Sequence, residues 1–141
     1  MNESVKTNPA KWFLPVAGLA LVWNLMGVAA YLNQMTMDLS ILPDAQRAFY
    51  ESIPVWATAA FAIAVFAGVA GSVGLLMKKR WAIPLLVVSF VAIVVQATHT
   101  LVLGNALEIF GSSILILPLI TLAIGLALIG LAFLSRNRAW I

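Results

Sequence analysis

The sequence predicts an all-α fold, an integral membrane antiparallel four-helix bundle with the N and C termini in the cytoplasm. Two properties of the composition lead to this prediction: 63% of the 141 residues are hydrophobic and only 9% are charged. A soluble domain has about 25% charged residues. Because so small a number of charged residues cannot cover the surface of a protein in water, the surface is predicted to face lipid. This excludes a soluble enzyme, a disordered chain and a nucleic-acid-binding module. The length predicts one domain over residues 1–141.

Four apolar stretches are long enough to cross a hydrocarbon core, which takes about 20 helical residues. None contains Asp, Glu, Lys or Arg, and the predicted spans are residues 12–32, 53–77, 81–103 and 109–134. Backbone groups in lipid must bond within the protein, and these stretches lack the alternation of barrel strands. They are therefore predicted to be helices. The first stretch is longer than a signal-peptide core and is predicted to be retained.

The charges in the connections predict the orientation. The chain has eight basic residues, and seven of them lie before span 1, between spans 2 and 3, or after span 4: Lys6, Lys11, Lys78, Lys79, Arg80, Arg136 and Arg138. The remaining one, Arg47, lies in the outer loop 33–52. Because basic residues concentrate on the cytoplasmic side, both termini and the loop between spans 2 and 3 are predicted to be cytoplasmic.

Two connections carry local signals. In the outer loop, Pro43-Asp44 followed by Ala-Gln-Arg-Ala-Phe-Tyr-Glu is typical of a short helix with Asp44 near its N-cap. An irregular loop with Phe49 and Tyr50 in the membrane interface is the alternative. Before span 4, Asn105 and Glu108 resemble a capping box.

Small residues predict how the helices pack. Helices in a bilayer associate through close contacts, at which Gly, Ala and Ser are enriched. Span 2 has a complete stripe of small residues at spacings of three and four: Ala57, Ala60, Ala64, Ala67, Gly71 and Gly74. Span 2 is therefore predicted to be the helix that the others approach most closely.

Polar side chains within the spans lie mainly toward the outer half, and polar groups at membrane depth usually face the bundle interior or a wet cavity. The candidate ligand-binding residues are Asn24, Tyr31, Gln34, Trp56, Gln96 and His99. Hydrogen bonding between helices is the alternative role for Asn24 and Gln96. His99 is either a pH-sensing or proton-relaying group, or a neutral imidazole held by Gln96 or a threonine.

The inventory of reactive side chains predicts neither an enzyme nor a cofactor. The chain has no Cys and one His. Without a carboxylate inside a span, these residues cannot complete a zinc site. No glycine-rich phosphate loop is present, because Gly68, Gly71 and Gly74 lie inside an apolar helix. No catalytic residue and no metal ligand is therefore predicted.

Several short motifs resemble a known group of proteins. They include Trp23-Asn24-Leu-Met-Gly27, Pro54-Val-Trp56, Lys78-Lys-Arg-Trp81-Ala-Ile-Pro84 and Leu103-Gly-Asn105-Ala-Leu-Glu108. This pattern resembles small four-span bacterial inner-membrane proteins that carry the label "sugar transporter". The resemblance covers most of the chain after Lys11. It implies a bacterial inner-membrane location and the same topology, and the label suggests transport of a sugar.

Two functions remain open from the sequence. The first is a membrane subunit or scaffold whose Ala and Gly faces dock onto another integral membrane protein. The second is a binder or transporter of a small neutral polar solute, which would need a homodimer to transport it. A dry, fully packed outer half would favour the first function, and a crevice lined by polar side chains would favour the second.

Overall fold

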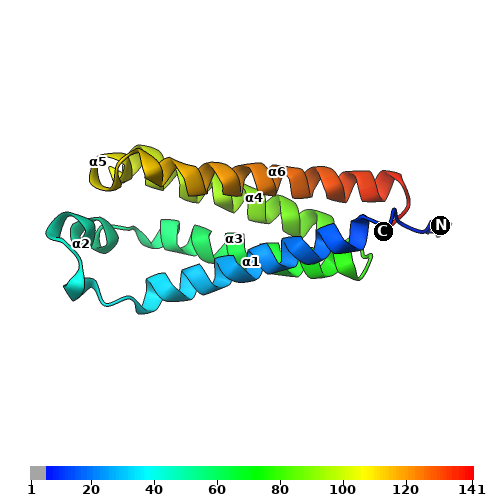
Figure 1. Cartoon of the computed structure of the whole chain (residues 1–141), viewed down its shortest axis with the longest axis horizontal. Helices are drawn as coiled ribbons and strands as arrows, with labels where there is room; N and C mark the ends of the chain where they lie inside the picture. The colour runs from blue at the N-terminus through cyan, green and yellow to red at the C-terminus, as the bar shows by residue number, and fades with distance from the viewer. Residues whose placement is uncertain (1–5) are drawn as a thin grey trace.

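The computed structural model describes residues 6–141, and their secondary structure is entirely helical (Figure 1). The long helices are α1 (Phe13–Thr36), α3 (Val55–Leu76), α4 (Ala82–Thr98) and α6 (Ile116–Asn137). With the short turns that extend α4 and α6, four helical segments are long and apolar enough to cross a membrane. The predicted all-α class and the four apolar helices are confirmed. Residues 1–5 of the predicted domain lie outside the described residues.

The boundaries of two predicted spans are corrected. The first helix continues to Thr36, beyond the predicted end at residue 32. The fourth span does not begin at residue 109, because Gly111 has φ +82° and interrupts the helix. Only glycine adopts such a backbone at little cost. The short helix α5 (Ala106–Phe110) precedes this break, and the 3₁₀ turn η3 (Ser112–Leu115) leads into α6.

The predicted capping box before span 4 is wrong. Asn105 does precede a helix, but it has a left-handed backbone with φ 55° and its side chain makes no capping hydrogen bond. An N-cap residue normally has an extended backbone, which directs its side-chain oxygen toward the free N–H groups of the first turn. Asn105 instead provides a tight turn, which asparagine tolerates better than most residues.

The helix α4 ends in a π-helical turn, η2 (His99–Leu103). The N–H of Gly104 donates to the carbonyl oxygen of His99 at 2.7 Å. A Cβ at Gly104 would lie 2.9 Å from that oxygen and 2.9 Å from a ring carbon of Phe49. Gly104 thus allows the chain to turn closely around His99.

The small residues of α3 determine the packing of the long helices. α3 packs against both α1 and α4, and α4 packs against α6. In an apolar stretch of 18 residues of α3, 44% of the residues are buried, against 28% for the third span, 17% for the first and 11% for the last. Gly71 faces Leu86, and Gly74 faces Ala82, without room for a Cβ at either glycine. The predicted role of the second span is found for α1 and α4, whereas α6 packs against α4 instead.

Both chain ends lie at one end of the bundle, here called the termini end (Figure 1). An apolar cluster fills this end and joins α1 to α6 through Phe13 and Leu131. Trp140 packs edge-on against Trp12 and Phe13, with ring centroids 5.5 Å apart in each case. Elsewhere in the described residues, no comparable packing joins α1 to α6, and Figure 1 shows these helices separating toward the opposite, distal end.

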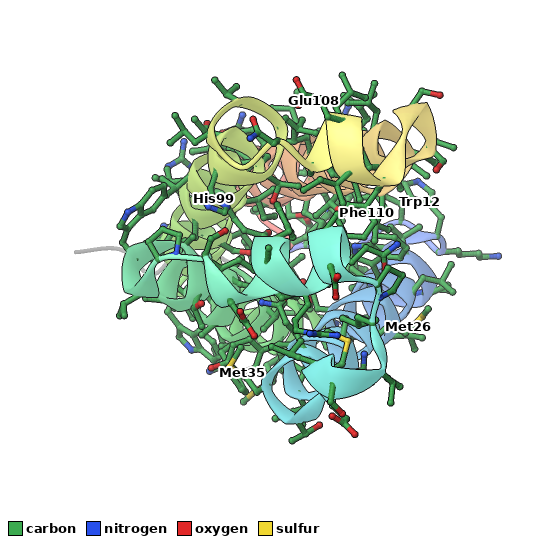
Figure 2. The ribbon with its side chains drawn as sticks, turned by 90° about the vertical axis from the view of Figure 1, so that its left-hand side faces the viewer. Trp12, Met26, Met35, His99, Glu108 and Phe110 are labelled. Carbon is green, nitrogen blue, oxygen red and sulfur yellow. The ribbon has the colours of Figure 1, made fainter. Side chains whose placement is uncertain are left out.

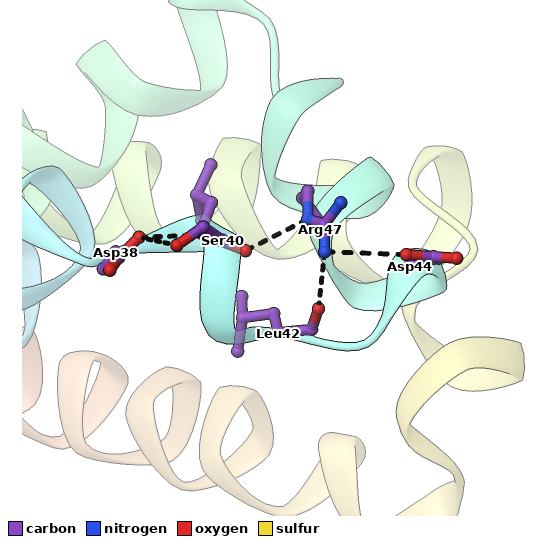
Figure 3. Close-up of polar contacts among 6 residues, drawn as sticks. Asp38, Ser40, Leu42, Asp44 and Arg47 are labelled. Carbon is purple, nitrogen blue, oxygen red and sulfur yellow. Dashed lines mark hydrogen bonds and ion pairs between the residues drawn. The ribbon is translucent and has the colours of Figure 1, made fainter.

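The outer loop is ordered by its own polar groups. It contains the 3₁₀ turn η1 (Leu39–Ile41) and the predicted helix, α2 (Asp44–Glu51), with Pro43 at the N-cap and Asp44 in the first turn. Arg47 donates to the carbonyl oxygens of Leu39 and Leu42 at 3.1 and 3.0 Å, as Figure 3 shows for Leu42.

Two carboxylates make further polar contacts within this loop. The nearest oxygen of Asp44 is 3.5 Å from the Arg47 guanidinium, and Asp38 accepts hydrogen bonds from the hydroxyl and the backbone N–H of Ser40 (Figure 3). Both hydrogen bonds lower the pKa of the Asp38 carboxyl, and the one from the Ser40 hydroxyl has the larger effect. The short helix predicted from Pro43-Asp44 is confirmed, and the irregular loop is not found.

The packing predicts the effect of adding one methyl group to α3. In Gly74→Ala the new Cβ would lie 2.8 Å from the Cβ and 3.1 Å from the Cα of Ala82. Because backbone must shift to admit it, we expect a loss of about 1–2 kcal/mol of stability. The control is Gly130→Ala, where nothing lies within 4 Å of the new atom. Thermal unfolding in detergent tests this, and equal midpoints for the two variants would contradict the close α3–α4 contact.

Candidate functional site

The distal half of the bundle contains a cavity of about 490 Å³. It lies between α1, α3, α4 and α6, where α1 and α6 no longer pack against each other. Pockets for small molecules typically measure about 300–1,000 Å³. Polar side chains in the lining come from five segments of the chain: Asn24, Asn33, Gln34, Tyr50, Ser89, Gln96, His99, Thr100 and Thr121.

Asn24 lies in the cavity wall and connects two helices. Its side-chain nitrogen donates to the carbonyl oxygen of Ala20 at 2.9 Å and to the hydroxyl of Ser72 on α3 at 3.1 Å. Gly68 makes room for this amide, because a Cβ there would overlap the Asn24 oxygen. Asn24 therefore has the helix-joining role that the sequence left open, and it also lines the cavity.

His99 is the most buried of the predicted ligand-binding residues. The residue is 7% exposed and lies in the cavity lining. Its ring contacts Trp56 edge-on at 5.5 Å and lies 6.3 Å from the ring of Phe49. In the view of Figure 2, His99 and Phe110 lie between α2 and α5.

The imidazole of His99 makes no hydrogen bond within the described residues. Every fully buried side-chain nitrogen or oxygen in that part of the chain has a partner. The ring nitrogens of His99 are therefore accessible from the cavity. The bond from Gln96 or a threonine to His99, one of the two predictions for this residue, is not found.

Two glutamines complete the polar part of the wall. Gln34 comes from α1 and Gln96 from α4, and both are half-buried and line the cavity. Neither side chain makes a hydrogen bond to another described residue. An amide offers two donors and an oxygen acceptor, so these side chains can bind uncharged polar groups from two sides of the cavity.

Two predicted residues lie outside the cavity lining. Tyr31 packs edge-on against Phe61 and Phe66 of α3, with ring centroids 5.5 and 5.9 Å apart. Trp56 is 47% exposed and reaches only the edge of the His99 ring. The structure thus brings together Asn24, Gln34, Gln96 and His99 around one cavity, and separates Tyr31 and Trp56 from it.

An aromatic cluster at the distal end of the cavity was missed. Phe49 and Tyr50 of α2 pack against Phe110 of α5, with ring centroids 5.4 and 6.2 Å apart. Phe49 and Tyr50 were predicted only as interfacial residues. The amphipathic short helix was a signal for burial, but nothing in the sequence pairs it with Phe110.

The polar side chains of the lining can form hydrogen bonds but carry no fixed charge. The described lining contains no Asp, Glu, Lys or Arg, and no cluster of metal-ligating side chains occurs within residues 6–141. An ion placed here would lack a fixed partner of opposite charge, which is costly in a low-dielectric site. The cavity is therefore suited to an uncharged molecule.

The different hydrogen bonding of His99 and Asn24 predicts different effects on stability when each is replaced. We expect His99→Phe to change the unfolding temperature little, because the imidazole makes no hydrogen bond within the described residues and Phe keeps a ring against Trp56. Asn24→Leu breaks the bond to Ser72, so it should destabilise the bundle by about 0.5–2 kcal/mol. Thermal unfolding in detergent compares the two variants. A larger loss for His99→Phe than for Asn24→Leu would show that His99 has a structural role instead.

Comparisons with known proteins found no match among protein-family models, curated proteins or solved structures. The resemblance to four-span proteins labelled "sugar transporter" therefore stays a prediction.

Proposed function

We propose that this protein is a multi-pass membrane protein that binds a small uncharged molecule in the distal cavity, through Gln34, Gln96 and His99. The observation that carries the proposal is His99, which is buried without a hydrogen-bond partner on the wall of a cavity of about 490 Å³. Its ring nitrogens are accessible from the cavity and bond to no described residue. A polar molecule bound in the cavity would supply the missing hydrogen bonds.

The role of subunit or scaffold is the second candidate. A scaffold acting only through its packing faces would be expected to have a dry, filled outer half, and the cavity is evidence against that. The open side between α1 and α6 favours the second candidate, because a helix of another integral membrane protein would find the two helices unpacked there. The two candidates differ in what would be found bound to the purified protein.

Transport is an extension of the binding proposal. Alternating access needs two groups of helices that move relative to each other. One chain with four short helices is too small to form two such groups, so transport would proceed through a homodimer. A sugar-like solute is the substrate suggested by the resemblance described above.

We further propose an antiparallel bundle in the bacterial inner membrane, with both termini and the 78–81 turn in the cytoplasm. Support comes from the basic residues near that turn and the termini, against the single Arg47 in the outer loop. It follows that the cavity lies in the outer half of the membrane.

Single cysteines test this orientation on a background without native Cys. Ala45→Cys lies on α2 and Asn137→Cys at the end of α6, and both positions are exposed. In spheroplasts, we expect a membrane-impermeant maleimide to label the first variant at once and the second only after permeabilisation. The reverse pattern would place the termini outside and contradict the proposed topology.

Native mass spectrometry of the protein in nanodiscs tests the proposed function. We expect the purified chain to retain a small molecule as a defined mass increment. The double variant Gln96→Leu/His99→Phe should lose at least about 90% of that species, because two hydrogen-bonding groups at roughly 1 kcal/mol each are removed. The matched control is Thr98→Val, which lies on the same helix but is exposed and outside the cavity lining.

The result also separates the two candidates. A bound species that is equally abundant in the double variant would place the ligand elsewhere and contradict the proposal. A second polypeptide in the complex, with no small molecule, would favour the subunit role.

A further inference from the structure

The cavity is open at the side of the bundle. Its lining combines buried, half-buried and exposed residues, and the exposed ones lie on two helices only: Met26, Ala30 and Asn33 on α1, and Leu117 on α6. All lining residues on α3 and α4 are buried or half-buried. These four exposed residues therefore mark an opening between α1 and α6, here called the side opening. Figure 2 shows Met26 at the periphery of the bundle.

The surface around the side opening is that of a lipid-facing protein. Next to the opening, α1 exposes Val22 and Leu25, and α6 exposes Ile116 and Ile120. Exposed aliphatic side chains on membrane-spanning helices are stable in contact with hydrocarbon. The side opening thus lies at the level of the acyl chains.

The distal end of the cavity is covered. Phe49, Tyr50 and Phe110 pack against one another above His99, and Phe49 is 7% exposed. A solute arriving from water would have to displace this aromatic cluster. A molecule arriving from the bilayer would meet no comparable barrier between α1 and α6.

The cavity lining divides into a polar and an apolar part. Gln34 and Gln96 lie near the distal ends of α1 and α4, and His99 and Tyr50 lie in the distal segments η2 and α2. The part nearer the middle of the bundle is lined by aliphatic side chains and by three polar ones that already donate to backbone carbonyl oxygens. The aliphatic residues are Val65, Leu86, Ile93, Ile124 and Leu128, and the polar ones are Asn24, Ser89 and Thr121. A sugar has hydroxyl groups on every side, and those facing the aliphatic part would be buried without partners. A molecule with one polar and one apolar part fits both regions.

We propose that the cavity binds a single-chain amphiphile with an uncharged polar head, which enters from the bilayer through the side opening. The head binds at Gln34, Gln96 and His99, and the chain lies along the aliphatic part of the wall. The absence of Asp, Glu, Lys and Arg from the described lining selects against a charged head. The inference rests on the proposed function and names the class of ligand.

The test uses a monoacylglycerol with a diazirine in its acyl chain as the probe. The full chain is reconstituted in phosphatidylcholine nanodiscs and irradiated, and the adducts are mapped by peptide mass spectrometry. We expect adducts on lining residues of α1 and α6, reduced at least fivefold by excess unlabelled monoacylglycerol. A diazirine-labelled glucose, used as a second probe, should give no adduct that excess glucose reduces.

Matched variants locate the route of entry. Ala30→Trp fills the side opening, whereas Ala29→Trp adds the same bulk at a neighbouring exposed position outside the lining. We expect at least fivefold less probe adduct in Ala30→Trp and an unchanged amount in Ala29→Trp. Leu117→Trp and its control Ile116→Trp repeat the comparison on α6, in case a substitution on α1 disturbs folding. Unfolding temperatures of all four variants are measured in parallel.

Three outcomes would overturn the inference. Adducts that excess monoacylglycerol does not reduce would show lipid contact without a site. Equal labelling in Ala30→Trp and Ala29→Trp, and again in the α6 pair, would exclude entry through the side opening. Labelling of the cavity by the glucose probe alone would reject the amphiphile but leave the proposed function intact. The proposed function fails separately, if native mass spectrometry finds no small molecule that depends on Gln96 and His99.

Discussion

The close approach of α3 to its two neighbours is the constraint from which the rest of the structure follows. At Gly71 and Gly74 the neighbouring helix comes so near that no side chain fits. Lipid provides no hydrophobic force between helices, so such contacts, with a few hydrogen bonds, must hold the bundle together. Because α3 has close contacts with α1 and α4, and α6 packs mainly against α4, α1 and α6 are left apart over the distal half. The cavity is the space that this arrangement leaves.

Much of the fold could be predicted from the sequence, because lipid imposes strong rules on composition. Length, hydropathy and the absence of charge identified the four helices, and the spacing of Ala and Gly identified the face of α3 that packs. The errors lie where the backbone leaves the regular helix. Gly111 has a positive φ that a glycine permits but does not require. The π-turn at His99 likewise depends on contacts between distant residues, which no local pattern encodes.

The candidate site was predicted in part, for the same reason. Gln34, Gln96 and His99 were identified because polar groups are costly in a membrane, and that rule does not depend on the exact rotation of a helix. Tyr31 was included because it shares a stripe with Asn24 and Gln34, but its ring packs against Phe61 and Phe66 of α3. The spacing along one helix does not predict that contact with another helix. The covering by Phe49 and Phe110 joins segments far apart in the sequence, so it became visible only in the folded chain.

The joint at Trp140 has a mechanical consequence. There Trp140, which follows α6, packs against Trp12 and Phe13 at the start of α1, whereas no comparable packing joins the distal ends of the two helices. A tilt of α6 relative to α1 would therefore pivot at this contact. α6 has 22 residues, about 33 Å at 1.5 Å per residue, so one degree of tilt at the joint displaces its far end by roughly 0.6 Å. A hydrophobic mismatch with the bilayer is one cause of helix tilt, and a tilt of α6 at this joint would change the width of the gap between α1 and α6.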